Sequence, residues 1–205
     1  MVAERIGRKF ELKDIIMIGV IGVLFAAVYL ATTALWTILQ AALTPFGAAT
    51  FAVDIIYGTW FMAGSLSAFI LRKPAAAFIA EFLASIIEML MGNFGGPMVV
   101  LFGAIQGAGN EVGFVLTGYR NFRLLGMILS GVMAAVFSFV GEIFAGTVEL
   151  LSPEIVVAKL ALRVASAVVF TGVISWLAGK GLARTGVLKS YPAGADVPRA
   201  RILED

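Results

Sequence analysis

The sequence contains no cysteine and no histidine. It therefore cannot form disulfide bonds, use a thiol nucleophile, assemble a zinc site of the usual Cys/His kind, or use histidine as an acid or base. It also lacks the Gly-x-x-x-x-Gly-Lys-Ser/Thr phosphate loop, because Gly179-Lys180-Gly181 does not have that spacing. We therefore expect no metal, no cofactor and no ATP hydrolysis by that route in this chain.

Charged residues are also scarce: they make up 14% of the 205 residues, whereas soluble domains are about a quarter charged. Hydrophobic residues make up 60%, more than one soluble domain of this size could bury, so lipid is the natural solvent. The net charge of +2 does not indicate a nucleic-acid partner. The N-terminal apolar run is too long for a cleaved signal peptide. We predict a multi-pass protein of the cell membrane, with the lipid bilayer as its surroundings.

Six stretches of the chain carry few charges and are close to the length of about 20 residues that a helix needs to cross a bilayer. They comprise residues 15–36, 50–71, 75–91, 98–117, 124–146 and 155–178, of which the third is the shortest. We predict an all-α, six-transmembrane-helix bundle that forms a single domain over residues 1–189. The polar segment 190–205 is predicted to be a disordered cytoplasmic tail.

The distribution of lysine and arginine predicts the orientation of these helices. If the N-terminus is cytoplasmic, the 15 basic residues all lie in inner segments except Lys159 and Arg163, which fall within the sixth stretch. Cytoplasmic loops favour Lys and Arg, so both termini are predicted to be cytoplasmic. A wrong helix count would scramble this alternation, so the pattern also supports the number six.

Residues 37–49 lie outside in this topology and are uncharged, largely apolar and interrupted by Pro45 and Gly47. They fit either an interfacial loop or a lid over an outward-facing pocket.

Small residues recur at a spacing of four on two of the predicted helices. The pairs are Gly22 with Ala26, Ala27 with Ala31, Gly103 with Gly107, and Gly109 with Gly113. Small side chains on one face form a groove that another helix can approach closely. Packing inside the bundle is one explanation for each pair. The first helix has few polar groups that tie it to the interior, so Gly22, Ala26, Ala27 and Ala31 are the candidates for docking an external partner.

Seven ionisable side chains fall inside the predicted helices, where charge is costly unless it faces a cavity or a partner. They are Asp54, Glu81, Glu88, Glu111, Glu142, Lys159 and Arg163. Their depth along the helices, with that of Gln106, places most of them in the outer half of the membrane. We therefore predict an outward-facing pocket. Its candidate substrate-binding residues are Tyr57, Trp60, Glu81, Glu88, Asn93, Gln106 and Glu142.

The alternative is that some of these groups form structural pairs, for example Arg163 with Glu142. Glu111 lies deeper and could hydrogen-bond between helices. In the outer half, acidic side chains outnumber the single Arg163 four to one, which favours a cationic ligand. Aromatic side chains, including Phe94, could stack on a flat ring. Carboxylates and amides could bind ring nitrogens and an exocyclic amine.

An ordered set of short motifs extends along most of the chain. The segments are Tyr57-Gly58-Thr59-Trp60-Phe61, Arg72-Lys73-Pro74, Glu81 and Glu88 at their spacing, Gly92-Asn93-Phe94-Gly95-Gly96-Pro97-Met98, and Gln106-Gly107-Ala108-Gly109-Asn110-Glu111. Together they resemble a known family, the substrate-binding (S) components of energy-coupling-factor transporters, of the YkoE type associated with thiamin or its hydroxymethylpyrimidine precursor.

The resemblance implies a six-helix subunit of a prokaryotic plasma membrane, with an outward ligand pocket and a covering loop after the first helix. It also implies that Ala27 and Ala31 dock on a transmembrane coupling subunit, with separate ATPase subunits as further partners. The implied function is capture of thiamin or hydroxymethylpyrimidine for an ATP-driven vitamin importer, without enzymatic activity.

Two other functions remain open from the residues alone. Intramembrane carboxylates such as Glu81, Glu88 and Glu111 would also suit a self-sufficient, proton-coupled secondary transporter of a cationic small molecule. The absence of an internal inverted repeat disfavours it. An intramembrane enzyme would need a Ser/Lys or paired-Asp site, and Asp54 is the only aspartate within the predicted helices.

Overall fold

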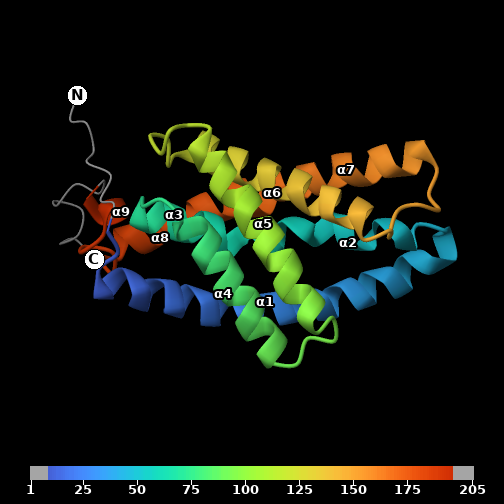
Figure 1. Ribbon diagram of the computed structural model, residues 1–205, viewed down its shortest axis with the longest axis horizontal. Helices are drawn as coiled ribbons and strands as arrows, with labels where there is room; N and C mark the ends of the chain where they lie inside the picture. Colours follow the sequence, from blue (N-terminus) through green and yellow to red (C-terminus); the bar gives the residue numbers. More distant parts are fainter. Residues whose placement is uncertain (1–8, 196–205) are drawn as a thin grey trace.

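The computed structural model describes residues 9–195, and every regular element in this range is a helix (Figure 1). The α-helices are α1 (Leu12–Leu43), α2 (Ala52–Ile56), α3 (Met62–Leu71), α4 (Ala76–Leu90), α5 (Pro97–Val115), α6 (Leu124–Phe144), α7 (Pro153–Ala167), α8 (Ser175–Arg184) and α9 (Pro192–Ala195). Short 3₁₀ segments are η1 (Thr44–Phe46), η2 (Ala49–Phe51) and η3 (Tyr57–Phe61), and η4 (Val168–Ile174) is a π-helix. The all-α prediction is confirmed.

Five helical stretches in the described range are long and apolar enough to cross a membrane. They are Leu12–Phe46, Ala49–Leu71, Pro97–Val115, Leu124–Phe144 and Pro153–Arg184. The third predicted crossing corresponds to α4, which has 15 residues. At about 1.5 Å per residue it spans about 22 Å, less than the hydrocarbon thickness of about 30 Å. A sixth crossing therefore stays a prediction.

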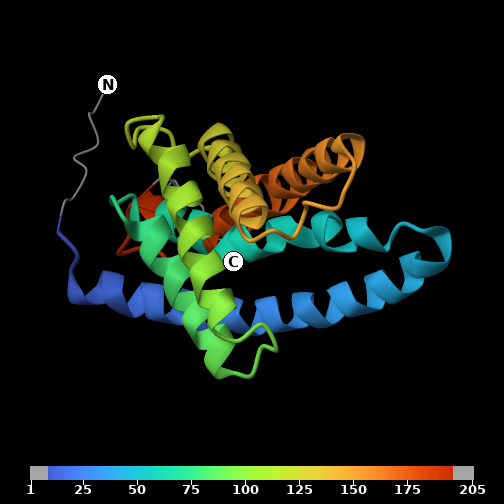
Figure 2. The same cartoon turned by 45° about the vertical axis from the view of Figure 1, so that its right-hand side comes forward.

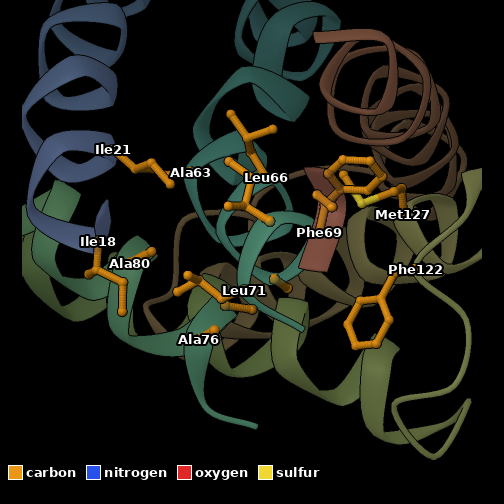
Figure 3. Packing of buried hydrophobic residues seen from close by; sticks show 14 of the residues in the cluster. Ile18, Ile21, Ala63, Leu66, Phe69, Leu71, Ala76, Ala80, Phe122 and Met127 are labelled. Carbon is orange, nitrogen blue, oxygen red and sulfur yellow. The ribbon is translucent and has the colours of Figure 1, made fainter. Parts of the chain in front are cut away.

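The helices pack around α3, all of whose residues are buried. Helix α1 runs along most of the length of the molecule, and α4 and α5 form a hairpin beside it (Figures 1 and 2). In the main apolar cluster, Ile18 and Ile21 of α1 pack with Leu66 and Phe69 of α3 (Figure 3).

The two ends of the described chain meet at one end of the bundle (Figure 1). There the Tyr191 hydroxyl donates a hydrogen bond of 2.8 Å to the Lys13 carbonyl, and Ala193 is buried. The folded part therefore continues past residue 190 as far as Ala195, so the first residues of the predicted disordered tail are packed. The rest of that tail, 196–205, lies outside the described residues. That this end faces the cytoplasm stays a prediction.

The segment after the first helix is more regular than the sequence suggested. Helix α1 continues to Leu43, so residues 37–43 are helical rather than a loop. The reversal takes place at Pro45 and Gly47, where Gly47 adopts a left-handed conformation with φ of 66°. Uncharged, apolar residues let the helix extend until proline and glycine end it.

Glu111, one of the intramembrane carboxylates, holds the start of α4. It accepts hydrogen bonds from the amides of Ala75 (2.6 Å), Ala77 (3.1 Å) and Phe78 (3.2 Å), and from the Tyr119 hydroxyl (2.5 Å). A carboxylate at a helix N-terminus satisfies free amides and complements the helix dipole. Burial and this contact with Glu111 raise the pKa of Tyr119 above its usual value. The prediction that Glu111 hydrogen-bonds between helices is therefore confirmed.

Glycines of α5 allow close approach of both neighbouring helices. Gly103 and Gly107 face α4, whereas Gly109 and Gly113 face the backbone of α6. A Cβ at Gly113 would lie 2.7 Å from the Leu129 carbonyl carbon, and one at Gly109 would lie 2.6 Å from Ala134 Cα. The small-residue spacing on this helix therefore serves packing inside the protein.

We expect Gly113→Ala to lower the free energy of unfolding by about 1–3 kcal/mol, because the new methyl group would push α5 away from α6. Gly19→Ala is the matched control, since nothing lies within 4 Å of a Cβ at this helical position. Thermal unfolding of the detergent-solubilised protein measures both changes. Equal midpoints for the two variants would contradict the close packing of α5 on α6.

Candidate functional site

A cavity of about 430 Å³ opens between α1, η3, α4, α5 and α6. Its volume lies within the range of small-molecule sites, about 300–1,000 Å³. All seven of the predicted substrate-binding residues line it: Tyr57, Trp60, Glu81, Glu88, Asn93, Gln106 and Glu142. The structure thus brings the sequence candidates together, although their contact with a ligand stays a prediction.

One wall of the cavity comes from α1, which the sequence analysis did not assign to the site. Tyr29, Thr33 and Trp36 contribute this wall. Their spacing of four and three residues places them on one helix face, a signal that was present in the sequence. They are also polar or aromatic in a helix that is mostly aliphatic. Further lining residues that were missed are Val53, Ser85, Gly95, Met98, Val99, Phe102, Thr147 and Lys159.

Glu81 lies at the inner end of this site and is fully buried. The Tyr29 hydroxyl lies 2.9 Å from each carboxylate oxygen, and the Gly64 amide donates to Oε2 at 2.9 Å. The Ala63 amide in turn donates to the Tyr29 hydroxyl at 3.1 Å. These donors orient the carboxylate and link α1, α3 and α4, but none of them carries a charge.

Glu88 lies two helical turns further out and is also buried. Its Oε1 accepts hydrogen bonds from Asn93 Nδ2 at 2.6 Å and from the Thr33 hydroxyl at 3.4 Å. Asn93 Nδ2 also reaches Thr33 Oγ1 at 3.1 Å, and Asn93 Oδ1 accepts from the Gly95 amide at 2.8 Å. Asn93 therefore joins the turn between α4 and α5 to the carboxylate.

Gln106 of α5 is more than nine-tenths buried and lines the cavity. Within the described part of the chain, its side-chain amide has no hydrogen-bond partner. Buried amides normally have partners, so both its donor and its acceptor are available to a molecule in the cavity.

Aromatic rings line the cavity on two sides. Tyr57 and Trp60 of η3 meet edge to face with ring centroids 5.6 Å apart. Toward the outer end, Trp36 of α1 stacks on Phe94 with centroids 5.9 Å apart and an interplanar angle of 28°. Figure 2 shows the turn that carries Phe94 beside α1. This stack connects the α4–α5 turn to the first helix across the cavity.

A buried ion cluster forms the wall at α2, α6 and α7. Asp54 pairs with Lys159 (2.5 Å) and with Arg163 Nε (2.7 Å), and Arg163 Nη2 pairs with Glu142 (2.8 Å). The guanidinium carbon also lies 3.7 Å from the centroid of the Tyr57 ring. The alternative of structural pairing is therefore correct for these groups, although Glu142 and Lys159 still border the cavity.

The pairing changes the expected charge balance of the site. Lys159 belongs to the same wall, so the ratio of acidic to basic groups is four to two rather than four to one. Asp54 and Glu142 are neutralised by Lys159 and Arg163. The acidic groups of the site that lack a basic partner among the described residues are therefore Glu81 and Glu88 of α4.

The docking candidates on α1 separate into two faces. Gly22 and Ala26 are buried, and a Cβ at Gly22 would lie 3.2 Å from the Leu83 side chain of α4. This pair cannot present a surface to an external partner, so that prediction is wrong for these two residues. Ala27 and Ala31 are exposed, and their docking role stays a prediction.

We expect Asp54→Asn to destabilise the protein by about 3–5 kcal/mol, because Lys159 and Arg163 would be left with too little negative charge in a buried site. Glu149→Gln is the control, since Glu149 is an exposed carboxylate at the same end of the bundle. Thermal unfolding in detergent compares the two variants. A fall of the same size for both would show that the cluster is not a stabilising unit.

Comparisons with known proteins agree with this architecture. Residues 13–137 match the family described as the permease component of an ABC-type cobalt transport system. No group of three or more Asp or Glu side chains between residues 9 and 195 is placed to hold a metal ion. The chain is 32% identical over 194 residues to a Bacillus subtilis (strain 168) protein described as an HMP/thiamine permease protein, YkoE, with 95% of each chain covered.

A solved structure gives the same result for the fold. It is described as the crystal structure of an S-component of an ECF (energy-coupling-factor) transporter, and it superposes with a TM-score of 0.87. The two share 32% sequence identity, and the match covers 94% of this chain and 95% of the other. Such agreement over nearly the whole length covers the helices that form the cavity as well as the remainder of the bundle. The chain is therefore a multi-pass membrane protein that belongs to the family of S components of energy-coupling-factor transporters.

Proposed function

We propose that this chain captures thiamin, or a related pyrimidine such as its hydroxymethylpyrimidine precursor, from outside the cell and delivers it to an ATP-driven importer. One observation carries the proposal. Glu81 and Glu88 line an aromatic cavity, and neither carboxylate has a cationic partner among the described residues. The name of the Bacillus subtilis relative points to the same ligands.

The electrostatic argument favours a positively charged ligand. A carboxylate held away from water is costly unless a counter-charge lies close to it. Among the described residues, Lys159 is the one basic side chain that lines the cavity, and it pairs with Asp54. Arg163 lies behind this wall and pairs with Asp54 and Glu142. A cationic ring would supply the missing charge for the α4 carboxylates, and its attraction to them would offset the cost of taking it out of water.

The remaining lining groups fit a flat heterocycle. Tyr57, Trp60 and Trp36 offer ring faces and edges, and a cation over an aromatic ring adds about 0.5–2 kcal/mol. The free amide of Gln106 can accept from an exocyclic amine and donate to a ring nitrogen. The seven-residue separation of Glu81 and Glu88 is about 10.5 Å along the helix. A ligand with polar groups at both ends could reach both carboxylates.

Orientation and energy supply complete the proposal. The lysine and arginine distribution orients both termini toward the cytoplasm, so the Trp36 and Phe94 end of the cavity faces outward. The sequence lacks a Walker-type phosphate loop, so ATP hydrolysis belongs to partner subunits. Exposed Ala27 and Ala31 provide a smooth face on α1 for a transmembrane coupling subunit.

Isothermal titration calorimetry of the purified protein in detergent tests the ligand. We expect saturable binding of thiamin or hydroxymethylpyrimidine, and a rise in unfolding temperature with ligand. Absence of both effects for thiamin, hydroxymethylpyrimidine and aminopyrimidine analogues would refute the assignment.

Glu88→Gln should weaken binding of a cationic ligand at least tenfold, or about 1.4 kcal/mol, because it removes a charge while keeping the shape of the side chain. Binding of a neutral pyrimidine should change much less. Calorimetry with both ligands measures the difference, with Glu149→Gln as the control for an exposed carboxylate that does not line the cavity. Unchanged affinity for the cation would remove Glu88 from the site.

Ala27→Trp together with Ala31→Trp should leave ligand binding intact and abolish uptake, because bulky side chains would block close helix packing with the coupling subunit. Leu125→Trp, at an exposed position of α6, is the control. The assay reconstitutes the chain in liposomes with its coupling and ATPase subunits. Full uptake by the double variant would contradict docking through this face.

The same liposomes address the proton-coupled alternative. Uptake driven by a proton gradient in vesicles that contain only this chain would support a self-sufficient transporter. We expect no such uptake without the partner subunits and ATP.

A further inference from the structure

The aromatic wall of the cavity is built on an irregular part of the second membrane span. Tyr57 and Trp60 belong to η3, a 3₁₀ turn between α2 and α3. A 3₁₀ turn within a span changes the backbone hydrogen-bonding pattern, and lipid offers no water to replace lost partners. Polar side chains from other helices must therefore bind the backbone of this turn.

Gly58 lies between these two aromatic residues in the sequence, and both its amide and its carbonyl form hydrogen bonds with side chains of other helices. The Gly58 amide donates to Ser166 Oγ at 3.0 Å, and the Gly58 carbonyl accepts from the Thr171 hydroxyl at 2.7 Å. Thr171 lies in the π-helical segment η4, and Ser166 lies at the end of α7, just before it. Both hydroxyl residues are buried, and neither lines the cavity.

Glycine is required for this contact. A Cβ at Gly58 would lie 2.6 Å from the carbonyl carbon of Ser166 and 2.8 Å from Ala167 Cα. The backbone of η3 therefore rests directly on α7 at its junction with the wider π-helical turns. The two irregular segments are joined at this point by hydrogen bonds and by direct backbone packing.

The same helix also contacts the side chain next to this glycine. Arg163, one turn before Ser166, places its guanidinium 3.7 Å from the centre of the Tyr57 ring. Asp54 and Glu142 fix the guanidinium itself. Residues of α7 and η4 therefore contact both the backbone of η3, at Gly58, and one of its aromatic rings, that of Tyr57.

We propose that Ser166 and Thr171 are positioning residues for ligand recognition: by holding Gly58, their hydroxyl groups set the placement of Tyr57 and Trp60 toward a flat cationic ring. The inference rests on the proposed function for its ligand. It predicts that affinity depends on two hydroxyl groups that the ligand does not touch.

The test uses Thr171→Val, which keeps the shape of the side chain and removes the hydroxyl, and Thr171→Ser, which keeps the hydroxyl. Ser166→Ala removes the second hydrogen bond and gives an independent variant if Thr171→Val does not fold. Ser175→Ala is the matched control, because Ser175 is buried in the same span but, among the described residues, its hydroxyl bonds only within that span, to the Phe170 carbonyl at 3.2 Å.

All variants are made in a background that carries Trp36→Phe and Trp176→Phe, so that Trp60 is the only one of the three tryptophans left. Calorimetry measures thiamin affinity, and tryptophan emission with near-ultraviolet circular dichroism reports the surroundings of Trp60 without ligand. We expect Thr171→Val and Ser166→Ala to lower affinity at least tenfold and to change the Trp60 signals. Thr171→Ser and Ser175→Ala should stay within twofold of the background protein.

The proposal is overturned if Thr171→Val and Ser166→Ala bind like the background protein. It is equally overturned if Thr171→Ser or Ser175→Ala loses as much affinity as they do, because the effect would then come from packing alone. Failure of the proposed function is a separate outcome: the protein with all three of its tryptophans would bind no thiamin. The ligand-free Trp60 signals of Thr171→Val and Thr171→Ser would still decide whether the hydroxyl positions the turn.

Discussion

Charged and polar groups inside a lipid-embedded bundle need partners within the protein, because the surrounding hydrocarbon provides none. This constraint explains most of the polar contacts described above. Asp54 and Glu142 meet Lys159 and Arg163, and Asp14 meets Lys73 at 2.6 Å. Each of these pairs balances an acidic side chain with a basic one and joins two separate helices or loops.

The same constraint gives meaning to the two carboxylates that have only neutral donors in the cavity. Glu81 is oriented by a tyrosine hydroxyl and a backbone amide, and Glu88 by an asparagine and a threonine. These contacts keep the carboxylates in place without cancelling their charge. Under the proposed function, such a site is pre-organised for its ligand, because the acceptors are already ordered before binding.

Irregular helices contribute to the site as much as the charged groups do. The 3₁₀ turn η3 brings two aromatic residues, Tyr57 and Trp60, to the cavity within four positions of the chain. The π-helical segment η4 lies against it and supplies the Thr171 hydroxyl to the Gly58 carbonyl. Departures from regular helix in a membrane are stable only where another element satisfies the backbone, so the two segments depend on each other.

The sequence by itself determined the helical class, five of the apolar spans and seven of the residues that gather in the cavity. Hydropathy and the helical repeat are local properties, so the depth of Glu88 or Gln106 along its span could be read without knowing the neighbours.

Only the tertiary structure decided which face of α1 points inward. It assigned Tyr29 to the cavity and buried Gly22 against α4, since small and aromatic residues are compatible with either face. It also decided that Lys159 pairs with Asp54 and that hydroxyls from η4 and α7 hold Gly58, because these contacts join residues more than a hundred positions apart and depend on how the helices pack.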